Sequence, residues 1–394
     1  MVCRKEHDWL QQFYLVFPVM QLSNSVSNTC VKLLVSAGLG LASVLSALAI
    51  PSIALAQLSP VEIAQVPAQL TLLRNIQHGR NVNAIAFSPN GQMLATAGGD
   101  GLIRVWDINF TLQGDEERWM QRLISIPSSD RYVTSLAFSP NNRYLVTGTY
   151  NGDVRIWDLN NCEQERPVCN SQLILDRDYI GVAPVVQFSP SGRWLAASNF
   201  DGTVTLWDWA SREIMAVLEP ETGSHDGSRL DGRFSSLTFS PDEAYLAAGS
   251  HDDFITLWSL DPAEEFERLT NIDTGNGVDS VAFSPDGEIL ASSSFKGVEM
   301  RSIRTRRGRL RVEEEIELEV GKRVNTMVFL ADGQSLFIGD NSDQVGLWDL
   351  AEEEPLAIPT NQQHTNPVLA VAISPVGNLL ASGSTDGVIK LWRP

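Results

Sequence analysis

One interval recurs through this sequence and constrains its fold more than any other feature. A large apolar residue that ends one alternating segment is followed nineteen positions later by the end of another, in seven copies. The paired positions are Phe87 and Trp106, Phe138 and Trp157, Phe188 and Trp207, Phe239 and Trp258, Phe283 and Ser302, Phe329 and Trp348, and Ile373 and Trp392. The copies start 44 to 51 residues apart, a period typical of a repeat protein rather than of unrelated domains.

Each copy contains three short apolar segments separated by turns. In the last copy these segments are residues 368–373, 379–384 and 388–392, with SPVG and TDG between them. The Ser-Pro-x-Gly turns, the Asp-Gly turns and the Trp-Asp pairs resemble the WD-repeat β-propeller family over about residues 69–394. The resemblance implies an all-β, seven-bladed propeller with four antiparallel strands in each blade.

The two ends of this repeat region are complementary. The last copy ends two residues after Trp392 and lacks a fourth strand, whereas residues 69–76 form a strand without a blade. Leu72 lies ten residues before Val82, just as Leu123 lies ten residues before Val133. An open ring would leave exposed strand edges, so we predict that residues 69–76 pair with the last repeat and close the ring.

The overall charge excludes one class of partner. The formal net charge is −19, while 43% of the residues are hydrophobic, enough for a globular core. A negative field of this size repels nucleic acid backbones and anionic lipid head groups. We therefore expect no nucleic acid partner. The separate expectation is a monomeric propeller that binds a protein or peptide.

The N-terminal region indicates export. Residues 33–56 contain no charged residue, and Ala54-Leu55-Ala56 precedes Gln57 in the pattern of a leader-peptidase site. This predicts a signal peptide over residues 1–56, a linker over 57–68, the propeller over 69–394, and a periplasmic or extracellular location. The alternative is an uncleaved membrane anchor at residues 33–56, with membrane contact only in that case. Met1 and Met20 both stand as possible start residues.

The cysteines are consistent with export. Cleavage after Ala56 would leave Cys162 and Cys169 as the only cysteines, with six residues between them. In an oxidising compartment we expect them to form a disulfide, and the alternative is two unpaired thiols in a surface loop.

Two copies carry a polar set that is open to two interpretations. The matching positions are His78, Thr96, Asp100 and Trp106, and His364, Ser382, Asp386 and Trp392. A hydroxyl, an imidazole and a carboxylate would suggest a hydrolase. The family resemblance implies instead a structural tetrad, in which Asp accepts from the imidazole and the hydroxyl links His to the indole N–H. We expect no catalytic residue, cofactor or metal ion.

Because the fifth copy departs most from the set, with Thr274, Lys296 and Ser302, we expect it to be the least stable blade.

The fifth copy continues into an arginine-rich run. Two interpretations stay open: an exposed hairpin whose charges pair across its strands, or a docking patch for an acidic partner or lipid head groups. The arginines are Arg301, Arg304, Arg306, Arg307, Arg309 and Arg311, and glutamates follow them.

The resemblance also implies a face where partners bind. Turns between second and third strands emerge together in this family. Seven residues before the tryptophan position, four consecutive blades carry the ring side chains Tyr150, Phe200, His251 and Phe295. Turns favour Ser, Asp and Gly, so grouped rings predict a recognition surface, or else rings folded onto neighbouring loops.

Two function classes follow. The first is a non-catalytic, exported scaffold that binds a protein or peptide on its loop face. The alternative is a propeller enzyme or a carbohydrate-binding protein that uses a central pocket. The sequence contains no phosphate-binding loop, no G-x-S-x-G turn and no metal-ligand spacing, which favours the first class.

Overall fold

The structure is a computed structural model that describes residues 70–394 except 109–120, 129–131, 163–170, 176–184, 200, 221–232, 307–308, 319, 352–353, 357–361 and 376–378. The predicted leader and linker, Phe200 and Cys169 lie outside the described residues. Residues Val66–Pro394 form one compact unit.

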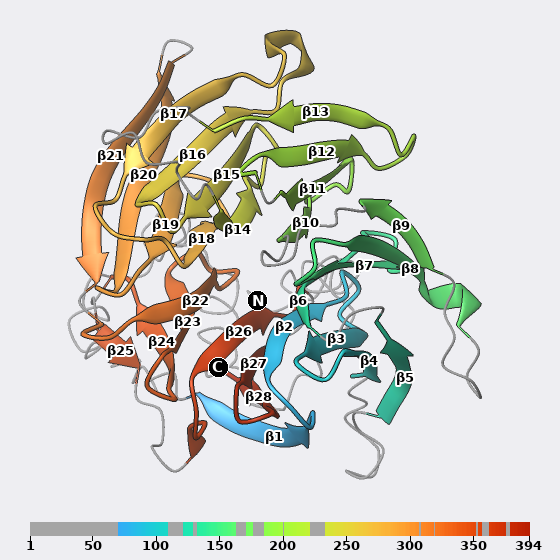
Figure 1. The fold of residues 1–394 in the computed structure, drawn as a ribbon. Coiled ribbons are helices and arrows are strands. Elements are labelled where there is room, and N and C mark those ends of the chain that lie inside the picture. Colours follow the sequence, from blue (N-terminus) through green and yellow to red (C-terminus); the bar gives the residue numbers. More distant parts are fainter. Residues whose placement is uncertain are drawn as a thin grey trace, which may run out of the picture. The chain divides into compact units, whose positions relative to one another are not determined.

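This unit consists of seven antiparallel four-stranded sheets arranged around a common centre (Figure 1). Blade one contains β2 (Val82–Phe87), β3 (Met93–Gly98), β4 (Leu102–Asp107) and β5 (Gln121–Pro127). Blade two contains β6 (Val133–Phe138), β7 (Tyr144–Thr149), β8 (Val154–Asp158) and β9 (Ser171–Leu175). Blade three contains β10 (Val186–Phe188), β11 (Trp194–Ser198), β12 (Val204–Asp208) and β13 (Ile214–Leu218). Blade four contains β14 (Phe234–Phe239), β15 (Tyr245–Ser250), β16 (Phe254–Ser259) and β17 (Arg268–Asp273).

The other three blades follow the same strand order. Blade five contains β18 (Ser280–Phe283), β19 (Ile289–Ser293), β20 (Val298–Arg306) and β21 (Arg309–Leu318). Blade six contains β22 (Val324–Phe329), β23 (Ser335–Asp340), β24 (Val345–Asp349) and β25 (Glu354–Leu356). Blade seven contains β26 (Val368–Ile373), β27 (Leu380–Ser384), β28 (Val388–Arg393) and β1 (Thr71–Gln77). The predicted seven-bladed propeller is confirmed.

Blade seven joins the first strand of the chain to the last. β1 pairs antiparallel with β28, which places Leu72 opposite Trp392 and Ile76 opposite Ile389. The predicted closure is therefore confirmed (Figure 1). Ile76 belongs to the apolar cluster between blades seven and one, and Leu70, just before the strand, belongs to the cluster between blades six and seven. The closing segment thus adds core on both faces of its blade.

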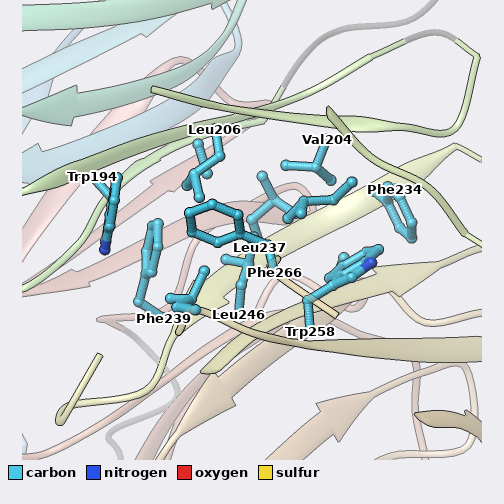
Figure 2. Packing of buried hydrophobic residues seen from close by; sticks show 13 residues of the cluster. Trp194, Val204, Leu206, Phe234, Leu237, Phe239, Leu246, Trp258 and Phe266 are labelled. Carbon is cyan, nitrogen blue, oxygen red and sulfur yellow. The ribbon is translucent and has the colours of Figure 1, made fainter. Parts of the chain in front are cut away.

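The core lies between neighbouring blades, because alternate side chains of each strand point to opposite faces of its sheet. Figure 2 shows the cluster between blades three and four. Trp194 and Phe266 meet edge to face at 87° with centroids 5.7 Å apart, and Phe234 and Trp258 do so at 82° and 5.7 Å. Each fully buried aromatic side chain stabilises the fold by about 1.5–3 kcal/mol.

The Ser-Pro-x-Gly turns also contribute to contacts between blades. In blade three, Gly192 has φ of +76°, a left-handed conformation that glycine adopts without strain. A Cβ atom on this residue would lie 2.1 Å from Cγ of Pro140, which belongs to the equivalent turn of blade two. Glycine is therefore required there both by the turn and by the close approach of the preceding blade.

Candidate functional site

The turns between second and third strands lie beside the connections that lead into the first strands. In four blades the amide N–H of a turn residue donates to a carbonyl oxygen eighteen residues earlier. These bonds run from Gly99 to Asn81 at 3.0 Å, Tyr150 to Tyr132 at 2.9 Å, Asn341 to Arg323 at 3.0 Å and Thr385 to Pro367 at 3.0 Å. We call the surface formed by these turns and connections the loop face. The predicted ring residue Tyr150 is one of these turn residues.

Tyr150 is one half of an exposed aromatic pair. Its ring meets that of Tyr132 edge to face, with centroids 6.1 Å apart, and the two residues are 45% and 47% exposed. A Cβ atom at Gly99 of blade one would lie 3.6 Å from the Tyr132 ring. The pair therefore stands at the junction of blades one and two. Tyr132 was not predicted from the sequence, because this residue lies in the connection before β6 and not in the turn. A search for rings eighteen residues before each turn position would have found it.

His251 lies at the turn of blade four, and its side chain is 57% exposed. Its Nδ1 is 3.9 Å from Oδ1 of Asp279, in the connection into blade five. Asp279 also accepts two hydrogen bonds from Arg323, Nε to Oδ2 at 2.9 Å and Nη2 to Oδ1 at 2.6 Å. These bonds raise the pKa of the Arg323 guanidinium above its ordinary value. The connections into blades five and six are thus joined by a two-bond ion pair that the sequence did not predict.

Phe295 is the most exposed ring in the described part of the loop face, at 58%. The carbonyl of its neighbour Ser294 accepts from the amide of Val324 at 3.1 Å, so the turn of blade five lies beside the connection into blade six. The loop face therefore carries exposed rings on blades two, four and five. The fourth predicted ring, Phe200, lies outside the described residues.

Blade seven brings its four polar positions into one chain of hydrogen bonds. Trp392 Nε1 donates to Ser382 Oγ at 2.9 Å, Ser382 Oγ lies 2.8 Å from His364 Nε2, and His364 Nδ1 lies 3.0 Å from Asp386 Oδ2. The His364 side chain is fully buried and the Asp386 side chain is 8% exposed. Because the serine oxygen already accepts the indole proton, the set works as a buried structural network.

Burial and hydrogen bonding determine the protonation states of His364 and Asp386 in this network. Burial lowers the pKa of His364 below its ordinary value, and Asp386 offsets this only in part. Burial by itself would raise the pKa of Asp386, but the amide N–H groups of Thr365 and Val388 and the imidazole outweigh it, so the carboxyl pKa is lowered. The network therefore holds a neutral imidazole beside a carboxylate.

Blade one differs from the expected tetrad. Trp106 Nε1 donates to Thr96 Oγ1 at 2.9 Å as expected. Arg104, however, lies between the other two members: its Nη1 is 3.1 Å from His78 Nε2, and its Nη2 is 2.7 Å from Asp100 Oδ2. His78 Nδ1 faces the carbonyl of Arg80 at 3.3 Å. The guanidinium thus takes the place of the direct imidazole–carboxylate bond.

The indole bond recurs in blade two and is replaced in blades four and five. Trp157 donates to Thr147 at 3.0 Å, ten residues earlier, as in blades one and seven. Trp258 donates instead to the carbonyl of Glu219 at 3.2 Å. In blade five, where Ser302 replaces the indole, Nη1 of the buried Arg301 donates to Ser292 Oγ at 3.1 Å. Arg301 is therefore an internal residue and not part of a surface patch.

The register of the arginine hairpin shows which charged positions of its two strands lie opposite each other. Arg301 lies opposite Glu314 in the register, but Arg304 lies opposite Arg311 and Arg306 opposite Arg309. Arg304 and Arg311 therefore carry like charges at opposite positions of the register. Arg301 itself binds Glu299 of its own strand, Nη2 to Oε2 at 2.5 Å, so cross-strand charge pairing in this hairpin stays a prediction.

Other expectations concern groups that the structure describes only in part. Cys162 takes part in a disulfide, and Cys169, its predicted partner, lies outside the described residues, so this pairing stays a prediction. Within the described ranges, no group of three or more His, Cys, Asp or Glu side chains is arranged to hold a metal ion. Those same ranges contain no helix with the length and apolar character needed to cross a bilayer.

Comparison with known proteins agrees with this architecture. The family described as WD domain, G-beta repeat matches residues 70–107, 121–158, 181–208, 222–259, 267–298 and 357–393. The chain belongs to the WD-repeat family. Blade six lies between the last two matched segments, so the Phe329–Trp348 spacing identified a repeat that the family match does not include.

Three relatives of this WD-repeat protein illustrate the range of the family. It is 33% identical over 187 residues to WD repeat-containing protein SL1-17 of Schistosoma mansoni, covering 47% of this chain and 56% of that protein. It is 25% identical over 307 residues to Periodic tryptophan protein 2 of Arabidopsis thaliana, covering 72% and 30%. It is 23% identical over 299 residues to Serine-threonine kinase receptor-associated protein of Gallus gallus, covering 76% and 63%. Each match thus spans less than two thirds of the relative, and none of the three names describes an enzyme.

Proposed function

We propose that this WD-repeat protein is an exported, non-catalytic scaffold that binds a protein or peptide on its loop face. Membership of the WD-repeat family and the names of its relatives support a protein-interaction scaffold as the general class. The observation that carries the choice of surface is the exposure of Tyr132, Tyr150 and Phe295 on turns and connections of one face. Such rings on a polar surface are the residue types that anchor protein interfaces.

The polar groups beside these rings would orient the partner. The Arg323 side chain is 48% exposed although it is held by Asp279, so its remaining N–H groups can meet a carbonyl or carboxylate of the partner. His251 on blade four, beside Asp279, offers a second polar contact. The proposed site therefore combines apolar anchors at Tyr150 and Phe295 with a cation whose position is fixed by an ion pair. Phe200 completes the set in the proposal.

Export is proposed together with this binding role. The uncharged segment at residues 33–56 would direct the chain across a membrane, with cleavage after Ala56, or would hold it there as an anchor. A Cys162–Cys169 disulfide belongs to the same proposal, because such bonds persist in oxidising compartments. The participation of Cys162 in a disulfide supports this view. A periplasmic or extracellular partner is therefore expected.

The binding proposal is tested by comparing three forms of the purified protein in quantitative capture from the exported fraction of its own cells. The test variant carries Tyr150→Ser, Phe200→Ser and Phe295→Ser, and the control carries Ile214→Ser and Val217→Ser on the exposed outer strand β13. We expect the test variant to lose at least tenfold of a captured protein that the control retains. All three forms should unfold at the same temperature, since the changed side chains with described positions are exposed. Equal capture by the test variant and the wild type would disprove the loop-face site.

A further inference from the structure

The outer strand of blade five differs from those of the other blades. β21 has ten residues, whereas the outer strands β1, β5, β9, β13, β17 and β25 have three to seven. It is the terminal strand of its sheet, so one of its edges has no neighbouring strand among the described residues (Figure 1). The partner strand β20 pairs with β19 only over Val298–Ser302, so the hairpin continues beyond the inner strands. Long free edges are the ones that accept another strand.

The middle of β21 presents an apolar face and a charged face. Leu310 and Val312 pack against the core cluster of blades four and five. Arg311 and Glu313, between and after them, are exposed. Within the hairpin, Arg311 lies opposite Arg304 and Glu313 lies opposite Ser302. Neither of these two charged residues therefore has an opposite charge across from it in its own sheet.

We propose that β21 pairs antiparallel with β21 of a second copy of this chain, about a two-fold axis at Val312. In this register Arg311 lies opposite Glu313 of the second copy, and symmetry repeats the pair on the other side of the axis. A slip of two residues places either two arginines or two glutamates on the axis, where like charges oppose each other. The order of charges along the strand therefore selects one register, and the free backbone groups of both edges gain partners.

The same charge order disfavours other occupants of this edge. An acidic peptide would meet Arg311 but would be repelled by the exposed Glu313 and Glu317. The head groups of an anionic membrane would likewise be attracted by Arg311 and repelled by Glu313 and Glu317. A second copy is the partner that matches both halves of the strand. The dimer departs from the monomer expected from the sequence, and it uses none of the loop-face residues.

A charge-swap series tests this inference by sedimentation velocity over a range of protein concentrations in 0.15 M salt, the condition at which exposed charges interact over ~8 Å. We expect the wild type to dimerise as concentration rises. Arg311→Glu and Glu313→Arg should each weaken dimerisation at least tenfold. The double variant Arg311→Glu with Glu313→Arg should restore it, because the same register again pairs opposite charges.

The control is Glu213→Arg, a charge reversal at an exposed residue beside the outer strand of blade three, which should leave dimerisation unchanged. Thermal unfolding of every variant establishes that each is folded, as expected for exposed positions. A wild type that stays monomeric throughout, single variants that dimerise as well as the wild type, or a double variant as weak as the single ones would each overturn the proposal.

Discussion

The ammonium group of Lys390 donates a hydrogen bond to the side-chain oxygen of Asn75, 3.0 Å away and 315 residues earlier in the sequence. The two residues lie opposite each other where β1 pairs with β28. Lys390 is only 8% exposed, and burial lowers its pKa below the ordinary value. This bond therefore satisfies a buried cation at the junction that closes the ring.

Asn75→Leu should destabilise the ring closure, because it leaves the Lys390 ammonium without this acceptor in a buried position. Because Asn75 itself is exposed and water can partly replace its oxygen, we expect the free energy of unfolding in urea to fall by about 0.5–1.5 kcal/mol. Gln77→Ala, at an exposed position of the same strand, is the control and should change it little. Equal losses in the two variants would show that the bond to Lys390 contributes nothing specific.

Ser382→Ala should cost more stability than Thr147→Val. Ser382 serves both the Trp392 indole and the His364 imidazole, so its loss leaves two buried groups without a partner. Thr147 accepts only from Trp157, so the shape-conserving valine leaves one such group. At about 1–3 kcal/mol for each unsatisfied group, the serine change should cost roughly twice as much in urea unfolding. Equal losses would mean that the imidazole gains nothing from the serine.

Stability should fall as the solution is acidified from neutral pH. Burial lowers the pKa of His78 and of His364 in the folded protein, so below about pH 6.5 the unfolded chain binds more protons than the folded one. The free energy of unfolding therefore decreases as pH falls through this range. Asp100 and Asp386, whose folded pKa values are also lowered, extend the loss below about pH 4.

The pH profile is measured by urea unfolding between pH 8 and pH 5. His364→Gln should reduce its slope, whereas His251→Gln, at a 57% exposed side chain, is the matched control. A wild-type stability that stays constant over this range would contradict the buried neutral state of the two imidazoles.

Arg104→Met should raise the pKa of His78. Burial lowers this pKa first and the Arg104 charge lowers it further, so removal of the charge takes away the second effect. The pKa of Asp100 should rise as well, because its hydrogen bond from Arg104 is lost. NMR titration of the imidazole measures the change, and Arg155→Met, at the equivalent position of blade two, should leave His78 as it is. An unchanged His78 titration in the Arg104 variant would argue against this contact.

The repeat spacing predicted the architecture because it records a backbone property that every blade shares. The nineteen-residue interval identified blade five despite Ser302 and blade six despite its absence from the family match, and the unpaired segment at residues 69–76 predicted the closure. The hydrogen-bond partners of individual side chains were harder to predict from the sequence. Arg104 enters the blade-one set from a neighbouring position on β4, which a match of His78 and Asp100 between repeats does not reveal.

The loop face shows the same limit. Position in the repeat located Tyr150 and Phe295, but not Tyr132, because only the turn position was searched for rings. The equivalent positions in three other blades carry Asn81, Arg323 and Pro367, so this position has no shared residue type. The expectation that blade five is the least stable stays a prediction. In blade five the Arg301 bond to Ser292 replaces part of the contact that the missing indole would make. Slower hydrogen exchange in blade five than in blade seven would contradict the expected order of stability.

The pairing of β1 with β28 also has a consequence for the order in which the protein is made. β1 leaves the ribosome before every other strand described, and its partner emerges after all of them. The nascent chain must carry a strand with apolar side chains such as Ile76 unsatisfied until translation is nearly complete. A chaperone that holds extended apolar segments would therefore act on β1 for longer than on any other strand described.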